Sequence, residues 1–405
     1  MACFKFVLTT FYLLALFWGA SAKDCLIDIK KLQQNHPLFL TQDSNDLIYP
    51  VTQTSTISFN TRDSFELECP GSGKVKAEDQ TFGEKVVAKC LADGVVGIEN
   101  QRFNVSEVEC TRKVSSTARY TKNTCWSQHS EIEVGFKLAS GKFIRVYNVC
   151  FDEETRNVVY STFNMTRDIG YQTAGNTRPA WSEGKFYKLP GVKMDELYNN
   201  DVQRQTINRQ LGLPEEDTSY VKPHGTRYLA RGHLTAKADF MYNAEQQATF
   251  HYINSAPQWQ SFNARNWFYL ERNLRNFVAE KYIDVLVYTG TYGALTLPHA
   301  STGEETDVYF YFDSNGERFV PIPELFWKVA YDPVHRAGVA VIGLNNPYQT
   351  DISASLICTN IADKISWLNF DIDKPAAGYM YACDVDEFRK AVRDFPDLDI
   401  KKLLT

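Results

Sequence analysis

A short stretch near the middle of the chain, "YLARGHLTAKADF" at residues 228–240, brings a cation and a histidine together. Arg231 and His233 stand between an apolar lead-in and a second run of apolar residues. A neutral imidazole accepts a proton near neutral pH, and a guanidinium binds phosphate through a fork of N–H donors. A lone histidine is more often a satisfied, partly buried side chain, so further residues are needed to indicate catalysis.

A second group of polar residues lies in "SFNARNWFYLERNLRNFVAEKY", residues 261–282, which has the spacing of a long helix. Asn263, Trp267, Glu271 and Arg275 recur every four residues and are expected to form one stripe on that helix. Taken alone, Glu271 and Arg275 would form a surface ion pair that contributes only a few tenths of a kcal/mol. An aromatic residue such as Trp267 on an amphipathic helix belongs more often to the core than to a platform for base stacking.

Asn254 lies toward the end of the strand-like run "ATFHYINSAPQ", residues 248–258, which comes directly before this helix. On its own it is best interpreted as a turn amide that bonds its local backbone. A strand-end histidine, a cationic neighbour and a helix with an amide, a carboxylate and a guanidinium together favour a catalytic site over unrelated features.

These residues resemble the DNA/RNA non-specific endonucleases, which have a ββα-metal (His-Me finger) active site. The family signature is Asp-Arg-Gly-His, then Asn-x-x-Pro-Gln, then Asn-x-x-x-Trp-x-x-x-Glu-x-x-x-Arg. The matching text is "ARGH" at 230–233, "NSAPQ" at 254–258 and "NARNWFYLERNLR" at 263–275. The chain is most similar to secreted arthropod members, the crustacean duplex-preferring and insect gut or salivary nucleases, in "GHLTAKADF", "INSAPQWQSFNARNW" and "GYMYAC".

The resemblance implies a role for each matched residue. His233 would be the general base that takes a proton from water, and Asn263 would be the one direct protein ligand of a hydrated Mg²⁺, which Mn²⁺ can replace. Glu271 would orient water in the hydration shell of that ion. Asn254 would support the surroundings of the metal and the base.

The resemblance also implies how the substrate is bound. Arg231 and Arg275, with Arg178 of "GNTRPAW" as a third, would bind the scissile phosphate and offset the charge that grows in the transition state. Phosphate contacts carry no base sequence, so the expected substrate is DNA, RNA or both, cleaved to 5'-phosphate ends. Ala230 stands where many members have Asp, which bears on catalytic strength.

Two other classes of function compete with an active nuclease. One is a nuclease-derived, salivary-type nucleic-acid-binding protein with weak or residual cleavage, which the replacement of Asp by Ala230 and the acidic chain both favour. The other is a structural or carbohydrate-binding secreted protein, which would leave the match of three ordered blocks unexplained.

The first residues of the chain indicate export. "MACFKFVLTTFYLLALFWGASA" has a cationic start, an apolar stretch and a small-residue cleavage site, so residues 1–22 are expected to be a cleaved signal peptide. An uncleaved anchor is disfavoured because the apolar run is short, and no later segment could span a bilayer. We therefore expect a secreted, extracellular protein with no membrane partner.

Cysteine usage agrees with an oxidising compartment. Cys3 leaves with the signal peptide, and the other eight cysteines form an even set without zinc-knuckle spacing, which predicts four disulfides. The pairing is open, although the isolation of Cys358 and Cys383 suggests a local pair. Asn104 and Asn164 begin glycosylation sequons.

The order of the elements predicts an α+β fold in two domains. Short alternating strands with six of the eight cysteines indicate a smaller disulfide-rich β module at 23–134, and the remainder, 135–405, is expected to be the nuclease domain with an antiparallel sheet core. A net charge of -6 argues against a chain that is basic throughout. A local basic segment remains, because no acidic residue interrupts Lys222, Arg227, Arg231 and Lys237.

Overall fold

The computed structural model describes residues 24–51, 53–125, 128–174, 178–370 and 375–405. The expected signal peptide, residues 1–22, lies outside the described residues. None of the helices in the described ranges has the length and apolarity needed to cross a membrane.

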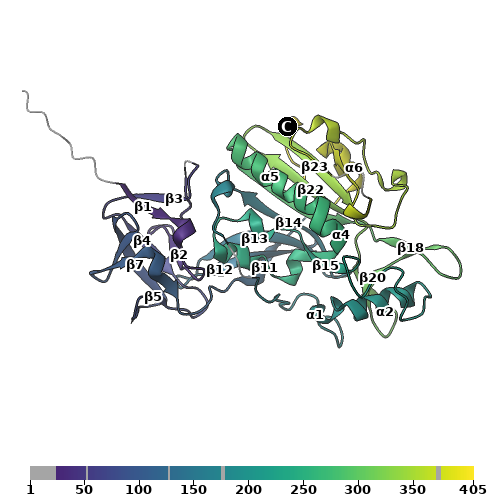
Figure 1. The fold of residues 1–405 in the computed structure, drawn as a ribbon, viewed down its shortest axis with the longest axis horizontal. Helices are drawn as coiled ribbons and strands as arrows, with labels where there is room; N and C mark the ends of the chain where they lie inside the picture. The colour runs from purple at the N-terminus through teal and green to yellow at the C-terminus, as the bar shows by residue number, and fades with distance from the viewer. Residues whose placement is uncertain (1–23, 52, 126–127, 175–177, 371–374) are drawn as a thin grey trace, which may run out of the picture.

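Small antiparallel sheets build residues 24–116, which we call the N-terminal module (Figure 1). Its elements are β1 (Asp24–Asp28), η1 (Ile29–Lys31), β2 (Leu38–Leu40), β3 (Thr56–Asn60), β4 (Ser64–Glu68), β5 (Val75–Ala77), β6 (Gln80–Thr81), β7 (Lys85–Ala92), β8 (Val95–Ile98), β9 (Gln101–Asn104), η2 (Val105–Glu107) and β10 (Val108–Cys110). The largest sheet has the order β2-β4-β7-β8-β9, beside the pair β1-β3 and the three-stranded sheet β10-β5-β6. In β7 alternate side chains are buried, as expected for a strand with one covered face.

A nine-stranded sheet forms the centre of the rest of the chain. Its strands are β11 (Thr117–Thr124), β12 (Ser130–Lys137), β13 (Phe143–Asp152), β14 (Asn157–Met165), β17 (Val285–Tyr292), β22 (Leu325–Asp332), β23 (Ala337–Leu344), β24 (Met380–Cys383) and β25 (Lys402–Leu403). The first eight are antiparallel neighbours in this order, and β25 pairs in parallel with β23. The predicted α+β class with an antiparallel core is confirmed. The expected domain boundary between residues 134 and 135 falls inside β12.

Helices cover both faces of this sheet. The helical elements are η4 (Ile169–Tyr171), α1 (Met194–Leu197), α2 (Asn200–Gln210), η5 (Lys237–Asp239), α3 (Asn243–Ala248), η6 (Tyr252–Asn254), α4 (Gln260–Phe262), η7 (Asn263–Trp267), α5 (Phe268–Lys281), η8 (Ser353–Ser355), η9 (Ala362–Lys364), η10 (Pro375–Ala377) and α6 (Val385–Ala391). Phe326 of β22 belongs to the apolar cluster that contains the buried side of α5, whereas its neighbour Trp327 belongs to the cluster that contains Phe388 of α6. Because successive strand residues point to opposite faces, α5 and α6 lie on opposite sides of the sheet (Figure 1).

A pair of antiparallel strands and the long helix that ends in α5 lie together on one face of the sheet. β15 (Leu229–His233) pairs with β16 (Ser255–Trp259), and α4, η7 and α5 follow as one continuous helix from residue 260 to 281. Asn345 after β23 holds this hairpin, because it accepts a hydrogen bond from the backbone of Trp259 and donates to that of Pro257. The remaining hairpins are β18 (Thr296–Pro298) with β19 (Glu305–Asp307), and β20 (Tyr309–Phe312) with β21 (Arg318–Pro321).

One predicted element is wrong in its first half. The run at residues 248–258 was expected to be a single strand, but α3 ends at Ala248 and η6 spans Tyr252–Asn254, so only the second half is β16. Helix α3 carries two of the contacts that dock the N-terminal module. The Tyr49 hydroxyl donates to Glu245 at 2.5 Å, and the Asn243 amide donates to the Gln34 carbonyl at 2.5 Å.

The four predicted disulfides are present: Cys25–Cys90, Cys69–Cys110, Cys125–Cys150 and Cys358–Cys383. The expected local pair of Cys358 and Cys383 is confirmed, and it ties the segment after β23 to β24. Both sequon asparagines, Asn104 and Asn164, are exposed.

Candidate active site

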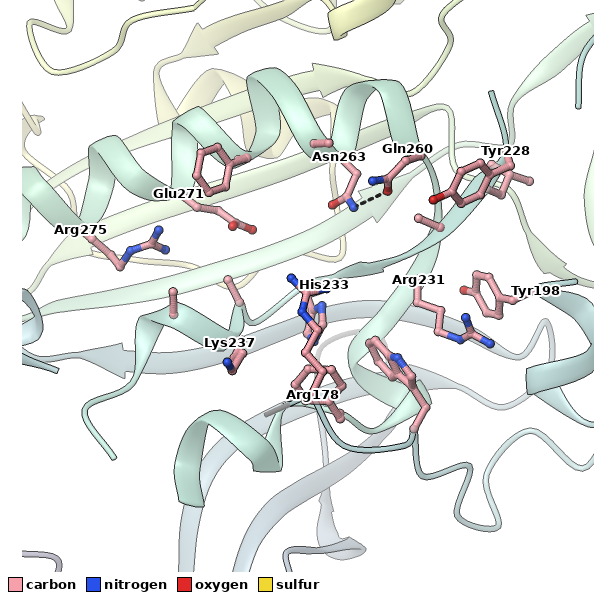
Figure 2. A pocket seen from close by; sticks show the side chains of 18 residues that line it. Arg178, Tyr198, Tyr228, Arg231, His233, Lys237, Gln260, Asn263, Glu271 and Arg275 are labelled. Carbon is pink, nitrogen blue, oxygen red and sulfur yellow. Dashed lines mark hydrogen bonds between the residues drawn. The ribbon is translucent and has the colours of Figure 1, made fainter. Parts of the chain in front are cut away.

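A cavity of about 690 Å³ opens between β15, the long helix and the segment around residues 178–181. Figure 2 shows that Asn263, Glu271 and Arg275 enter it from the helix, facing His233 and Arg231 from the strand. Six of the seven expected site residues line it: Arg178, Arg231, His233, Asn263, Glu271 and Arg275. Among the described lining residues Glu271 is the single acid, against the cations Arg178, Arg231, Lys237 and Arg275. The cavity therefore has a positive potential in a chain whose net charge is -6.

His233 is held in an aromatic enclosure at the end of β15. Its ring lies 4.7 Å from that of Trp181 and 5.0 Å from that of Phe250, between centroids. Burial, with a smaller contribution from the cations Arg178 and Lys237, lowers the pKa of His233 to about 3. Nε2 is buried and has no hydrogen-bond partner within the described part of the chain. The imidazole is therefore neutral at neutral pH and can accept a proton.

The long helix does not present its four-residue stripe as expected, because it begins with a π-helical turn. The wider turn η7 places Trp267 in the core, against Phe326 at 5.6 Å between ring centroids, while Phe268 stays exposed and lines the cavity. π-Helical turns inside α-helices are frequent at functional sites. Here the turn lets Asn263 and Glu271 face one cavity although the tryptophan between them points away.

The Asn263 amide fits a metal ligand. Its Nδ2 donates to Oε1 of Gln260 at 3.0 Å, which fixes the amide so that Oδ1 is the atom left for another partner (Figure 2). A neutral oxygen donor with a carboxylate nearby suits a cation that keeps most of its water. No group of three or more His, Cys, Asp or Glu side chains that could hold a metal occurs among the described residues. Asn263 and Glu271 are thus the oxygen donors that the helix offers.

Glu271 belongs to a group of charges in the wall of the cavity, two of which, Asp239 and Lys328, are buried. Burial raises the pKa of Glu271 to about 7; Lys328 and Arg275 lower it, and Asp239 raises it. Arg275 is itself paired, because its Nη1 lies 2.7 Å from Oδ1 of the buried Asp239. Lys328, in the middle of β22, is 2% exposed and donates to the Thr289 hydroxyl at 2.5 Å. The group is compensated overall, with two carboxylates and two cations.

Arg231 is held in place by side chains that the sequence analysis did not identify. Its Nη2 lies 2.5 Å from Oδ1 of Asp195, and its Nε donates to the Tyr252 hydroxyl at 2.9 Å. Its guanidinium also lies over the Tyr198 ring, 4.7 Å from the centroid. An incoming phosphate would compete with Asp195 for this guanidinium.

Asn254 does not line the cavity. It is fully buried, donates to the carbonyls of Thr235 and Thr249 at 2.9 and 3.0 Å, and accepts from the Thr235 backbone at 2.9 Å. Its side chain therefore connects the segment after His233 to the end of α3. Asn254 supports β15 and does not contact the cavity.

The glycine between Arg231 and His233 allows close packing in the hairpin. A Cβ on Gly232 would lie 2.6 Å from the Cβ of Gln258, which pairs across from Ala230. Ala230 lines the cavity, so the missing family Asp leaves an apolar patch beside Arg231.

Several residues of the site were missed by sequence reasoning. Lys328 had a signal, since it is the one charge inside the apolar strand "LFWKVAY", and Asp239 stands alone in the "ADF" that follows His233. Asp195, by contrast, lies in an ordinary polar helix start with nothing to mark it. Of the basic segment, Arg231 and Lys237 line the cavity, and Lys222 and Arg227 do not.

A strand-borne histidine, a paired strand and a helix with an amide and a carboxylate define a nuclease with a ββα-metal type of site. The model of the DNA/RNA non-specific endonuclease family matches residues 128–388, and the chain belongs to this family.

Three relatives with salivary names are similar to the chain over most of its length. The chain is 26% identical over 378 residues to a salivary endonuclease of Lutzomyia longipalpis, covering 91% of this chain and 84% of the relative. It is 20% identical to the salivary protein Tsal2A of Glossina morsitans morsitans, covering 91% and 90%, and 23% identical to a salivary endonuclease of Culex quinquefasciatus, covering 70% of each. A crystal structure of the EndoG/EndoGI complex aligns with a TM-score of 0.38 and 17% identity, over 64% of this chain and 87% of that one.

Proposed function

We propose that the chain is a secreted, Mg²⁺-dependent endonuclease that hydrolyses the phosphodiester bonds of DNA, RNA or both and leaves 5'-phosphates. The observation that carries this proposal is the cavity itself. A neutral histidine, an amide oxygen and a carboxylate face one another there among four cations, which is the set of groups that phosphodiester hydrolysis needs.

His233 acts as the general base. It is neutral, it lines the cavity, and its ring is fixed by Trp181 and Phe250. In the free protein the cations Arg178 and Lys237 help to hold the pKa of this imidazole low. A phosphate in the cavity offsets their charge and raises the proton affinity of His233, so the base becomes stronger when substrate is bound.

Asn263 is the residue that would hold the metal, and Glu271 accepts hydrogen bonds from water beside it. When bound, Mg²⁺ supplies Lewis-acid stabilisation of charge on the leaving 3'-oxygen. Glu271 serves this purpose best when ionised, and Lys328 and Arg275 favour its ionised form.

The arginines bind the phosphate and make no contact that depends on the identity of the bases. Arg275 is oriented by Asp239 and Arg231 by Tyr252, so each guanidinium meets the substrate from a fixed direction, while Asp195 competes with the phosphate for Arg231. Arg178, which is exposed at the mouth of the cavity, is the third phosphate ligand. Contacts of this kind accept many sequences and weaken as salt is added.

An extracellular location is supported by the four disulfides and by the salivary names of the relatives. Asn104 and Asn164 are exposed and are proposed to carry glycans.

The test uses purified protein with plasmid DNA and with single-stranded RNA, in Mg²⁺ or in EDTA. His233→Ala is compared with His224→Ala, a matched change at an exposed histidine outside the cavity. We expect cleavage with Mg²⁺, none with EDTA, a loss of about 100-fold or more in His233→Ala, and normal activity in His224→Ala.

Two results would contradict the mechanism: cleavage that persists in EDTA, or cleavage that persists in His233→Ala. Tight binding of nucleic acid without cleavage by the wild type would instead favour a binding protein descended from a nuclease.

A further inference from the structure

A second, smaller cavity of about 160 Å³ lies where the N-terminal module meets residues 179–182 and 247–251 of the rest of the chain. The module contributes Lys113, Ser115 and Ser116 to its lining, and the other side contributes Ser182 and His251. A water molecule takes up about 30 Å³ in the liquid, so the cavity has room for a phosphate group with some water.

The two cavities are neighbours. Phe250 lines both, and the segment from Arg178 to Ser182 separates them: Arg178 and Trp181 face the first, whereas Pro179, Ala180 and Ser182 face the second. A nucleic-acid strand with its scissile phosphate at His233 therefore needs to cross only this segment to reach the second cavity.

The second cavity is positive. Among the described residues that line it there is no Asp or Glu. Partial burial lowers the pKa of the Lys113 ammonium, and within the described chain this group has no carboxylate partner. Lys113 also contributes, after burial, to lowering the pKa of His251 to about 4. Lys113 is an exposed residue without a carboxylate partner among the described residues, and such a cation beside a buried imidazole is a favourable place for an anion.

Ser116 and His251 bring a hydroxyl and an imidazole into contact in the wall, and the tautomer of His251 decides which of them donates. The Ser116 hydroxyl lies 2.9 Å from Nε2 of His251, which is 5% exposed and whose Nδ1 has no hydrogen-bond partner in the described residues. A neutral His251 with its proton on Nε2 donates to the Ser116 oxygen. The hydroxyl hydrogen of Ser116 is then available to a second acceptor.

We propose that this second cavity, formed by Lys113, Ser116 and His251, binds a backbone phosphate of the nucleic-acid substrate next to the one that is cleaved. The N-terminal module is then part of the substrate-binding surface. The proposal rests on the proposed nuclease function, and the phosphoryl group could equally come from free phosphate, which the test separates.

The first measurement is binding of a labelled single-stranded oligonucleotide in EDTA, by fluorescence anisotropy, over a range of salt. Lys113→Gln is expected to weaken binding about fivefold and to reduce the slope of log Kd against log salt by about 0.7, the value for one lost phosphate contact on a single strand. Lys89→Gln, an exposed lysine of the same module outside both cavities, is expected to match wild type. Inorganic phosphate is then added at constant ionic strength. An unchanged affinity of wild type for the oligonucleotide shows that the phosphate of the strand is the ligand, whereas a fall to the affinity of Lys113→Gln shows that the cavity binds free phosphate.

The second measurement is cleavage with Mg²⁺. Lys113→Gln and Ser116→Ala are expected to raise KM for the long oligonucleotide and to leave kcat/KM for a dinucleotide unchanged, since its single phosphodiester occupies only the first cavity. Equal losses on both substrates, or an unchanged salt slope, would overturn the proposal. If wild type cleaves and these variants behave like it, only this inference fails; if wild type neither binds nor cleaves, the proposed function fails with it.

Discussion

Replacing Glu271 by Gln should make the protein more stable at high pH while it lowers the rate of cleavage. Burial raises the pKa of Glu271 from an ordinary 4.5 to about 7. Below pH 4.5 the carboxyl is protonated in both the folded and the unfolded chain, and above 7 it is ionised in both. The folded chain therefore loses stability as the pH rises between these values. At about 1.4 kcal/mol per pH unit the loss approaches about 3 kcal/mol.

The assay is thermal unfolding in EDTA at pH 4.5 and at pH 8.5, for wild type and Glu271→Gln. A gain of about 3 kcal/mol corresponds to a rise in Tm of roughly 5–10 °C for a domain of this size, and it should be present at pH 8.5 and absent at pH 4.5. Cleavage by the variant should fall about 10–100-fold. Glu280→Gln, at an exposed position of α5, should show neither effect. A Tm difference that is the same at both pH values would refute the conclusion that burial raises the pKa of Glu271.

Three further changes test other parts of the site. Phe268→Ala removes an exposed ring from the cavity wall, and the Kd for single-stranded DNA in anisotropy should rise about tenfold, whereas an unchanged Kd would exclude stacking on this ring. Lys328→Met removes a cation that favours ionised Glu271, so the pKa of Glu271 should rise and the acid limb of kcat/KM should move to higher pH; a profile that stays in place would argue against this coupling. Asp195→Asn frees Arg231 from its ion pair, and KM should fall severalfold; an increase in KM would mean that Asp195 is needed to orient the arginine.

Much of the scaffold could be predicted because its local signals are strong. The helix at 261–282 follows from its helical spacing, and the continuous helix of the structure begins and ends within a residue of the expected ends. The run at 248–258 was mistaken for one strand because α3 and η6 there are short and are held by tertiary contacts. The alternation of apolar and polar residues that marks a strand cannot be recognised reliably where short helical turns interrupt it.

The placement of Trp267 confirms the prediction that this aromatic residue belongs to the core, but it shows where sequence spacing fails. A step of four residues predicts that it shares a face with Asn263 and Glu271. The π-helical turn and the contact with Phe326 rotate it into the core instead. Only packing against β22 decides this, since the same residues would also satisfy a regular α-helix.

The sequence by itself determined which groups could do chemistry: the histidine, the amide, the carboxylate and the arginines, in an order that indicates a nuclease. The tertiary structure decided what surrounds them, because burial and charge depend on residues distant in the chain. Asp239 and Lys328 compensate Arg275 and Glu271, Asp195 holds Arg231, and Asn254 supports the strand from outside the cavity. The pKa values of His233 and Glu271 follow from that enclosure, which no local pattern encodes.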